Sequence, residues 1–409
     1  MKNTNILISG ASIAGPALAY WLRSYGFDTT IVERAPAPRP GGQAVDLRGA
    51  GRTVVERMGL LEAARKIALE QRGIRWVDGN RRVRAEMTAE AFGGEGIISE
   101  IEILRGDLCQ LFYDATAAET EYIFDDTITA LDQDVDGVTV TFENAPPRRF
   151  GLVIGADGLY SVVRTLAFGP EVDCVTPLEC YTAWFTAPAA PDLDGWYEMH
   201  NIAGGRVASL RPGRLFDESK AGMSFRSAPV DYDRRNIAEQ RELLASRFEG
   251  IGARVPWLLE AARTATDFAF DSLGQVHLES WSNGRIALVG DAGYCPTPLT
   301  GLGTSLALVG AYALAGELAA ADGDHTVAFA NYERVVRPYV TQGQELPPGG
   351  VRGYAPMRSI AIRMQAASMR SMGRWPIRPI LARQFAKAGD IDLPDYRVKA
   401  GGLSRSRAE

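Results

Sequence analysis

The sequence predicts an α/β protein in which helices cover a parallel sheet. Residues 5–9 form an apolar run of the buried-strand type that ends at Gly10. Residues 14–25 then carry apolar side chains at helical spacing, and residues 28–33 have the composition of a second strand. Because strand, helix and strand follow one another within about thirty residues, they form a βαβ unit, whose two strands run parallel.

The elements after this unit follow from periodicity and from turn residues. Residues 122–144 are predicted to form a hairpin, since Asp136-Gly137 suits a tight turn between strands. Residues 180–228 alternate β-type segments rich in Trp, Tyr and Phe with Gly/Pro turns. Further strands are predicted over residues 74–85, 97–103, 152–155 and 285–289, and helices over residues 53–69, 108–118, 237–248, 255–262 and 302–321.

Composition limits the class of protein. The 409 residues are 46% hydrophobic and 23% charged, as in a folded protein with more than one domain. The net charge of −6 speaks against a general affinity for nucleic acid. We find no apolar run of about 18 residues that would predict a membrane span. Four cysteines and three histidines lack metal-type spacing, so we expect no metal site and a cytoplasmic enzyme with reduced thiols.

The segment between the first strand and the first helix has the features of a dinucleotide-binding turn. Gly10 permits a tight turn, and Gly15 lets the helix pack closely on the strand. Ser12 replaces the usual middle glycine, and its small side chain still permits close approach and can donate a hydrogen bond. The helix, which begins at Ala14, offers free N–H groups to a pyrophosphate.

The end of the second strand indicates which adenosine the turn binds. Glu33 lies there, and its carboxylate can accept hydrogen bonds from a ribose 2′-OH but would repel a 2′-phosphate. The tightly bound cofactor is therefore FAD or NAD and not NADP. Arg34 either reaches the adenine or ribose or is a solvated strand end.

Two later segments point to FAD. Gly155-Ala-Asp157-Gly158 follows one buried strand, and Gly290-Asp291 follows another and continues through Pro298 to Gly301-Leu302-Gly303. Together these residues resemble the class A flavoprotein monooxygenases, the para-hydroxybenzoate hydroxylase-like group. In that family, the aspartate of the Gly-Asp pair holds the FAD ribityl chain. The Asp-Gly segment serves both FAD and the incoming NAD(P)H.

The physical properties of these segments agree with the resemblance. A carboxylate such as Asp291, at the carboxyl end of a strand, can accept hydrogen bonds from a polyol. Gly301 and Gly303, at the start of a helix, leave backbone N–H groups uncovered beside Pro298. These groups could stabilise negative charge on a reduced flavin. The chain departs from the family at Tyr294, where histidine is frequent, and in Gly301-Leu302-Gly-Thr-Ser305, where Gly-Gln-Gly-x-Asn is frequent.

The resemblance extends over nearly the whole chain. The loop at residues 41–48 is similar to the one beside the flavin in tetracycline-inactivating monooxygenases, which implies that Gln43, Ala44 and Asp46 contact FAD. Arg105 matches the family arginine that approaches FAD; the alternative is a surface residue in front of a helix. The chain also resembles the polyketide hydroxylases. This resemblance implies a role in antibiotic biosynthesis or resistance.

The resemblance implies a reaction. FAD is bound non-covalently, NADPH or NADH reduces it transiently, and O2 is the co-substrate. Oxygen adds at flavin C4a, and the terminal peroxide oxygen passes to an aromatic or polyketide-like small molecule. No side chain need act as acid or base, and we name no catalytic residue. The alternatives are a flavin dehydrogenase or reductase without oxygen insertion, and a flavin-bound protein that sequesters a ligand without turnover.

The expected organisation is a Rossmann-like FAD-binding domain with an inserted β-sheet domain for substrate and a C-terminal helix. We expect a monomer or a weak homodimer.

The inserted domain holds the candidate substrate residues. Glu198 and Lys220 occupy places similar to substrate-contacting positions of the tetracycline-inactivating enzymes, although the residue types differ. The alternative for the aromatic residues of this domain is that they form the core of its own sheet. The candidate substrate residues are Trp184, Glu198, Arg211, Lys220, Met223 and Phe225. The expected parts are an FAD-binding domain at 1–178 and 264–345 (β-rich at 73–103), a substrate domain at 179–263, a helical cap at 346–400 and a disordered tail at 401–409.

The expected cap contains a helix over residues 355–373. Met357, Ile360, Met364 and Ala367 share one face of it. This face either packs on the body of the protein, covers the substrate entrance as a flexible lid, or binds a membrane surface.

Overall fold

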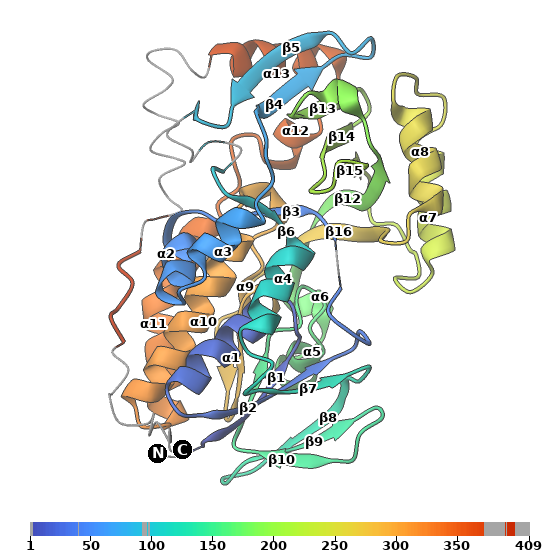
Figure 1. The fold of residues 1–409 in the computed structure, drawn as a ribbon. Helices are drawn as coiled ribbons and strands as arrows, with labels where there is room; N and C mark the ends of the chain where they lie inside the picture. Colours follow the sequence, from blue (N-terminus) through green and yellow to red (C-terminus); the bar gives the residue numbers. More distant parts are fainter. Residues whose placement is uncertain are drawn as a thin grey trace.

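Two large sheets, one above the other in Figure 1, organise the protein. The computed structural model describes residues 3–39, 41–91, 96, 99–371, 389 and 391–396. The lower sheet contains the N-terminal βαβ unit, and most of the upper sheet comes from the middle of the chain. The predicted tail at 401–409 lies outside the described residues, as does most of the cap beyond residue 371.

The lower sheet has six strands in the order β17-β18-β11-β1-β2-β7. β1 pairs in parallel with β2 on one side and with β11 on the other. Parallel pairing continues to β7 and β18, and β17 adds an antiparallel edge. The predicted α/β fold on a parallel sheet is confirmed. The bounds are β1 Asn5–Ser9, β2 Asp28–Glu33, β7 Glu121–Phe124, β11 Leu152–Gly155, β17 Ser282–Asn283 and β18 Ile286–Leu288.

Long helices cover this sheet and enclose the largest hydrophobic core. Within the described residues, α10 (Gly303–Ala320) is the one helix long and apolar enough to cross a membrane, and most of it is buried inside the protein. Residues 53–69, predicted as one helix, form two, because Gly59 adopts φ +73° after the first. The other helices of this part are α1 Ala14–Ser24, α2 Gly49–Arg57, α3 Leu61–Lys66, α4 Arg105–Asp114, α5 Val162–Phe168, α6 Glu171–Cys174, α9 Asp291–Tyr294 and α11 His325–Gly343.

The upper sheet has seven strands in the order β16-β12-β15-β14-β13-β4-β5. The predicted strand at 74–85 is a hairpin, because Asp78 Oδ1 accepts hydrogen bonds from the N–H groups of Asn80 and Arg82 and turns the chain. The sheet thus takes strands from residues 73–88 and 269–276 as well as from the predicted insertion. The bounds are β4 Gly73–Val77, β5 Val83–Thr88, β12 Val175–Pro188, β13 Trp196–Ile202, β14 Arg206–Pro212, β15 Glu218–Arg226 and β16 Ala269–Val276.

Two smaller sheets complete the fold of the residues that the structure describes. β3 (Ala44–Asp46) pairs antiparallel with β6 (Glu102–Leu104), between the two large sheets in Figure 1. β8 (Ile128–Gln133) and β9 (Val138–Phe142) form the predicted hairpin around Asp136-Gly137 and are joined by β10 (Arg148–Phe150). The start of the predicted 122–144 hairpin instead enters the lower sheet as β7.

The register of the upper sheet separates its two faces, because paired residues in neighbouring strands share a face. Glu198 aligns with Leu210, and Leu210 with Ala221. Leu210 and Ala221 belong to the core beneath α7 (Ile237–Phe248) and α8 (Val255–Thr264). Arg211 aligns with Lys220 on the opposite face, which we call the inner face.

The C-terminal helices α12 (Gly350–Tyr354) and α13 (Ser359–Ser371) lie beside the upper sheet (Figure 1). Met369 packs with Trp76 of β4 in a small apolar cluster. Met357, Ile360 and Met364 are instead exposed, as is Ala367. The interpretation in which these four residues pack on the body is therefore wrong: Ile360, Met364 and Ala367 lie on the exposed side of α13, and Met357 precedes that helix.

A buried ion cluster fastens α8 to the upper sheet. Glu198 is 4% exposed and accepts hydrogen bonds from Arg75 (3.0 Å), Arg81 (3.3 Å) and Arg254 (3.2 Å), the residue before α8. Burial alone would raise the pKa of Glu198, but the arginines, Arg81 foremost, bring it below its ordinary value. Glu198 is therefore an ionised structural group at neutral pH.

Replacing this carboxylate should destabilise the fold. We expect Glu198→Ala to lower the free energy of unfolding by about 3 kcal/mol, because it leaves three partly buried guanidiniums without their shared partner. Urea unfolding measures this change. The control is Glu260→Ala, which breaks an exposed Glu260–Arg263 pair and should cost little. Equal losses in the two variants would contradict the assignment.

Candidate active site

The turn after β1 has the geometry of a phosphate-binding turn. Gly10 adopts φ +107°, and a Cβ there would lie 2.6 Å from the carbonyl oxygen of Ala156. A Cβ at Gly15 would lie 1.9 Å from the carbonyl oxygen of Gly10, so α1 could not pack so closely with another residue there. The residue before α1 is Ile13, whose side chain cannot cap the helix. The first N–H groups of α1 are thus available to an anion.

Arg105 joins this turn to the 41–48 loop. Its guanidinium donates to Ser12 Oγ through Nε (3.2 Å) and Nη2 (2.9 Å). Its backbone N–H donates to the carbonyl of Gln43 (2.9 Å), and Ala44 pairs with Leu104 between β3 and β6. Arg105 is half-buried, so the alternative of a plain surface residue is wrong.

The acidic end of β2 also points into the turn. Glu33 Oε2 accepts a hydrogen bond from the N–H of Ala11 (2.9 Å), and Oε1 accepts one from the N–H of Ala35 (3.0 Å). These bonds orient the carboxylate beside the phosphate turn, as expected for a ribose contact. Arg34 is exposed, which fits the solvated strand end better than a buried contact.

The Gly155–Gly158 segment has a clear local role. Asp157 accepts hydrogen bonds from Ser161 Oγ and from the N–H groups of Val162 (2.8 Å) and Val163 (3.2 Å). Asp157 therefore accepts the first N–H groups of α5, and Ser161 caps the helix by accepting from the N–H of Arg164 (2.9 Å). Burial raises the pKa of Asp157, and the bond from Ser161 opposes this shift. A contact to a cofactor would have to use the exposed edge of this half-buried side chain.

Asp291 lies close enough to Arg105 for the two charges to interact. Gly290 adopts φ +64° after β18, and this conformation places Asp291 at the start of α9. The Asp291 side chain is accessible to solvent although protein surrounds it, so desolvation raises its pKa while Arg105 lowers it. The carboxylate can therefore accept hydrogen bonds from a ligand that enters beside it. Tyr294, at the histidine position of the family, lies in the core and hydrogen-bonds Tyr332 (2.9 Å).

The turn before α10 meets the 41–48 loop. Pro298 begins a short 3-10 helix, η3 (Pro298–Thr300), and Gly301 follows with φ +67°. A Cβ at Gly301 would lie 3.1 Å from Asp46 Oδ2. Leu302 precedes α10 without capping it, and Gly303 begins the helix. Ser305, at the asparagine position of the family, donates to the carbonyl of Arg48 (3.0 Å) and ties α10 to the loop.

Known proteins match this arrangement. A family model described as an FAD binding domain matches residues 3–328. A flavin-dependent monooxygenase of Legionella longbeachae serogroup 1 (strain NSW150) is 37% identical over 344 residues, which are 84% of this chain and 88% of that protein. The chain belongs to the FAD-dependent monooxygenases.

The chain is also similar to a solved structure and to a second bacterial protein. The crystal structure of the tetracycline destructase Tet(51) superposes with a TM-score of 0.82 at 32% identity, over 97% of this chain and all of that one. The uncharacterized protein Rv1260 of Mycobacterium tuberculosis (strain ATCC 25618 / H37Rv) is 45% identical over 354 residues, 86% of this chain and 95% of that protein.

The geometry fits FAD. Free N–H groups of α1 and the Arg105 guanidinium suit a diphosphate, Glu33 suits a ribose, and Asp291 suits a polyol. Bound FAD supplies the electron-transfer and oxygen-transfer chemistry of this class, with NAD(P)H and O2 as its reactants. The predicted cofactor and the predicted monooxygenase activity are confirmed.

The cysteine near Asp291 has no special reactivity. Cys295 is buried, and burial raises the pKa of its thiol well above the ordinary value. It is therefore a small core residue that keeps its proton.

The six candidate substrate residues divide between the two faces of the upper sheet. Trp184 aligns with Gly222 and shares the inner face with Arg211 and Lys220. Glu198, Met223 and Phe225 lie on the opposite face beneath α7 and α8, where Met223 and Phe225 belong to the core. This placement contradicts the prediction that these three line the substrate pocket, since the helices cover their side.

One buried residue near the site was not predicted. Glu102 of β6 is 5% exposed and accepts a hydrogen bond from Arg211 Nη1 (2.6 Å), on the inner face. The signal in the sequence is a lone carboxylate in the apolar run Ile101-Glu102-Ile103, because a charged residue in a buried strand needs a partner.

Asp291 offers a direct test of the cofactor site. We expect Asp291→Ala to weaken FAD binding roughly ten- to a hundredfold, because a hydrogen bond to a charged group contributes about 1.5–3 kcal/mol. Quenching of flavin fluorescence gives the Kd. Asp132→Ala, which removes an exposed carboxylate of β8, is the control and should bind FAD as the unchanged protein does. An unchanged Kd in Asp291→Ala would remove this residue from the site.

Proposed function

We propose that this FAD-dependent monooxygenase oxygenates a flat polycyclic aromatic or polyketide-like molecule. The molecule binds between the inner face of the upper sheet and the turn before α10. The observation that carries the proposal is the shared position of Trp184, Arg211 and Lys220 on the inner face, on the side of the 41–48 loop. Arg211 bonds Glu102 of β6, and Lys220 Nζ lies 3.8 Å from where a Cβ of Gly41 would be.

The inner face has the chemistry for a flat, oxygen-rich ligand. The Arg211 guanidinium stacks over the ring of Tyr197 at 3.9 Å, which gives a planar surface with a cationic edge. Trp184 is half-buried and adds a second aromatic surface. Lys220 Nζ donates to Thr186 Oγ1 (2.7 Å) and Glu218 (3.0 Å), so a second cation is held in place.

The likeness to the tetracycline destructase supports the substrate class. It covers almost the whole chain, including the upper sheet. We propose tetracyclines and related polycyclic phenols as the first compounds to test, and a cytoplasmic protein that acts as a monomer or weak homodimer.

The proposed cofactor residues follow the same logic. Each lies in one of the turns described above or beside one of them. The set is Gly10, Ser12, Ala14, Gly15, Glu33, Gln43, Ala44, Asp46, Arg105, Asp157, Gly290, Asp291, Pro298, Gly301, Leu302 and Gly303.

Turnover under labelled oxygen tests the proposal. Purified FAD-loaded protein is supplied with NADPH or NADH, 18O2 and a panel of tetracyclines and polycyclic phenols. We expect at least one compound to stimulate NAD(P)H oxidation and to gain one 18O atom by mass spectrometry. Reduction without label would favour a dehydrogenase or reductase, and binding without NAD(P)H consumption would favour sequestration. If smaller aromatics were labelled and no polycyclic compound was, the substrate class would be wrong.

A further inference from the structure

Asp267 lies where the upper sheet meets the 41–48 loop. It comes just before β16, whose first residue, Ala269, pairs with Trp184 of β12. Beyond that pair, the Asp267 side chain takes over the role of the strand. Its Oδ1 accepts a hydrogen bond from the N–H of Thr186 (2.8 Å), and its Oδ2 accepts one from the hydroxyl of Thr186 (2.6 Å). One residue of β12 thus binds both carboxylate oxygens.

Lys220 determines the direction of these hydrogen bonds. It is 8% exposed and aligns with Thr186 between β15 and β12. Its ammonium donates to Thr186 Oγ1 (2.7 Å), so the single hydroxyl proton of Thr186 is left for Asp267. Lys220 Nζ also lies 4.0 Å from Asp267 Oδ2 and 3.0 Å from Glu218. The ammonium and the hydroxyl therefore fix the orientation of the Asp267 carboxylate.

The oriented carboxylate faces the backbone of the 41–48 loop. Gly41 adopts φ +74° and Gly42 adopts φ +85°, a conformation that favours glycine. A Cβ at Gly41 would lie 3.1 Å from Asp267 Oδ2, so any side chain there would press on the carboxylate. The loop can follow this path only because its closest residue has no side chain.

The same stretch of the loop is bonded to the start of α4. The carbonyl of Gly41 accepts from the N–H of Gly106 (2.8 Å), and the carbonyl of Gln43 accepts from the N–H of Arg105 (2.9 Å). Arg105 in turn donates to Ser12 in the phosphate turn. Residues 41–43 therefore meet the upper sheet at Asp267 and are linked to the phosphate turn through α4.

We propose that Asp267 is a positioning residue for the flavin. Oriented by Thr186 and Lys220, its carboxylate fixes the path of the loop at Gly41, and the residues that follow are thereby placed for contact with the cofactor. The inference rests on the proposed function, in which the 41–48 loop contacts FAD. Asp267 acts through the loop and touches neither cofactor nor substrate.

Two substitutions of Thr186 test this role, because positioning and simple packing predict opposite results. Thr186→Val keeps the volume of the side chain and removes the hydroxyl that orients Asp267. Thr186→Ser keeps the hydroxyl and removes a methyl group. We expect Thr186→Val to weaken FAD binding roughly tenfold, as for the loss of one hydrogen bond to a charged group, and Thr186→Ser to stay within about twofold of the unchanged protein. Quenching of flavin fluorescence gives the Kd.

The outcome at Thr186 decides between the two roles. Equal losses in the two variants, or a loss in Thr186→Ser alone, would mean that packing matters and would overturn the proposal. Asp267→Asn is the direct variant, because it keeps the shape of the side chain and removes its charge. We expect it to weaken FAD binding roughly tenfold as well and to change the absorption band of the bound flavin, since the loop beside the flavin shifts.

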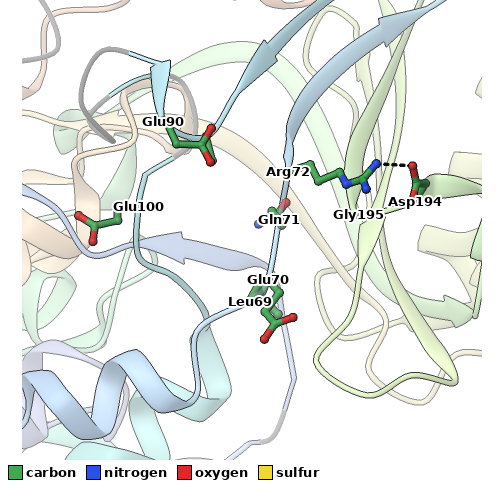
Figure 2. A pocket seen from close by; sticks show the side chains of 9 residues that line it. Leu69, Glu70, Gln71, Arg72, Glu90, Glu100, Asp194 and Gly195 are labelled. Atoms are coloured by element: carbon green, nitrogen blue, oxygen red, sulfur yellow. Dashed lines mark hydrogen bonds and ion pairs between the residues drawn. The ribbon is translucent and has the colours of Figure 1, made fainter.

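Two control variants change charges elsewhere in the same part of the protein. Asp194→Asn neutralises a carboxylate that pairs with Arg72 in the wall of a pocket of about 750 Å³ (Figure 2). Arg214→Ala removes a 3.1 Å ion pair between the β14–β15 hairpin and Asp107 of α4. Both should leave the Kd for FAD and the flavin spectrum unchanged. If Arg214→Ala had the same effect as Asp267→Asn, any link between the upper sheet and α4 would suffice, and the proposal would be wrong.

Gln43→Ala separates this inference from the proposed function, which places the Gln43 side chain on the cofactor. If Gln43→Ala weakens FAD binding while Thr186→Val and Asp267→Asn do not, the positioning role is wrong and the cofactor site stands. If none of the three does, the loop is not part of the cofactor site, and this inference fails together with that part of the proposed function. If Asp267→Asn does not fold, the two Thr186 variants carry the test.

Discussion

The site is assembled around the position of one guanidinium. Arg105 donates to Ser12 in the phosphate turn and, through its backbone, to Gln43 in the neighbouring loop. Its charge also opposes the rise in the pKa of Asp291 that burial causes. Segments that are remote in the sequence therefore share one cation, and a single ligand that carries a diphosphate can contact all of them. Without this residue, the turns would lose the cation that they share.

The parts that could be predicted from the sequence are those governed by local geometry. Gly10 and Gly15 are recognisable because a Cβ at either position collides with backbone atoms a few residues away or on the next strand. Glu33 and Asp291 are recognisable because each stands at the end of an apolar strand. These local requirements were enough for the fold and for a dinucleotide cofactor. The choice of FAD and the class of reaction came from the resemblance of the glycine-bearing segments to the class A flavoprotein monooxygenases.

The parts that could not be predicted depend on contacts between distant segments. The alternation of residues in β13–β15 shows that there are two faces, but which face meets α7 and α8 depends on the packing of the whole domain. Glu198 and Lys220 therefore looked equivalent and lie on opposite sides. Glu102 escaped notice because its partners, Arg211 and Gln71, lie on other elements that only the folded chain brings together.

The upper sheet has a consequence for any attempt to redesign the enzyme by recombination. Its strands come from three stretches of the chain, and β4 and β16 are contributed by segments that precede and follow the rest. A cassette cut from residues 179–263 would leave behind β4, β5 and β16 and divide β12. Chimaeras with altered specificity should therefore be joined at points that keep all seven strands from a single parent.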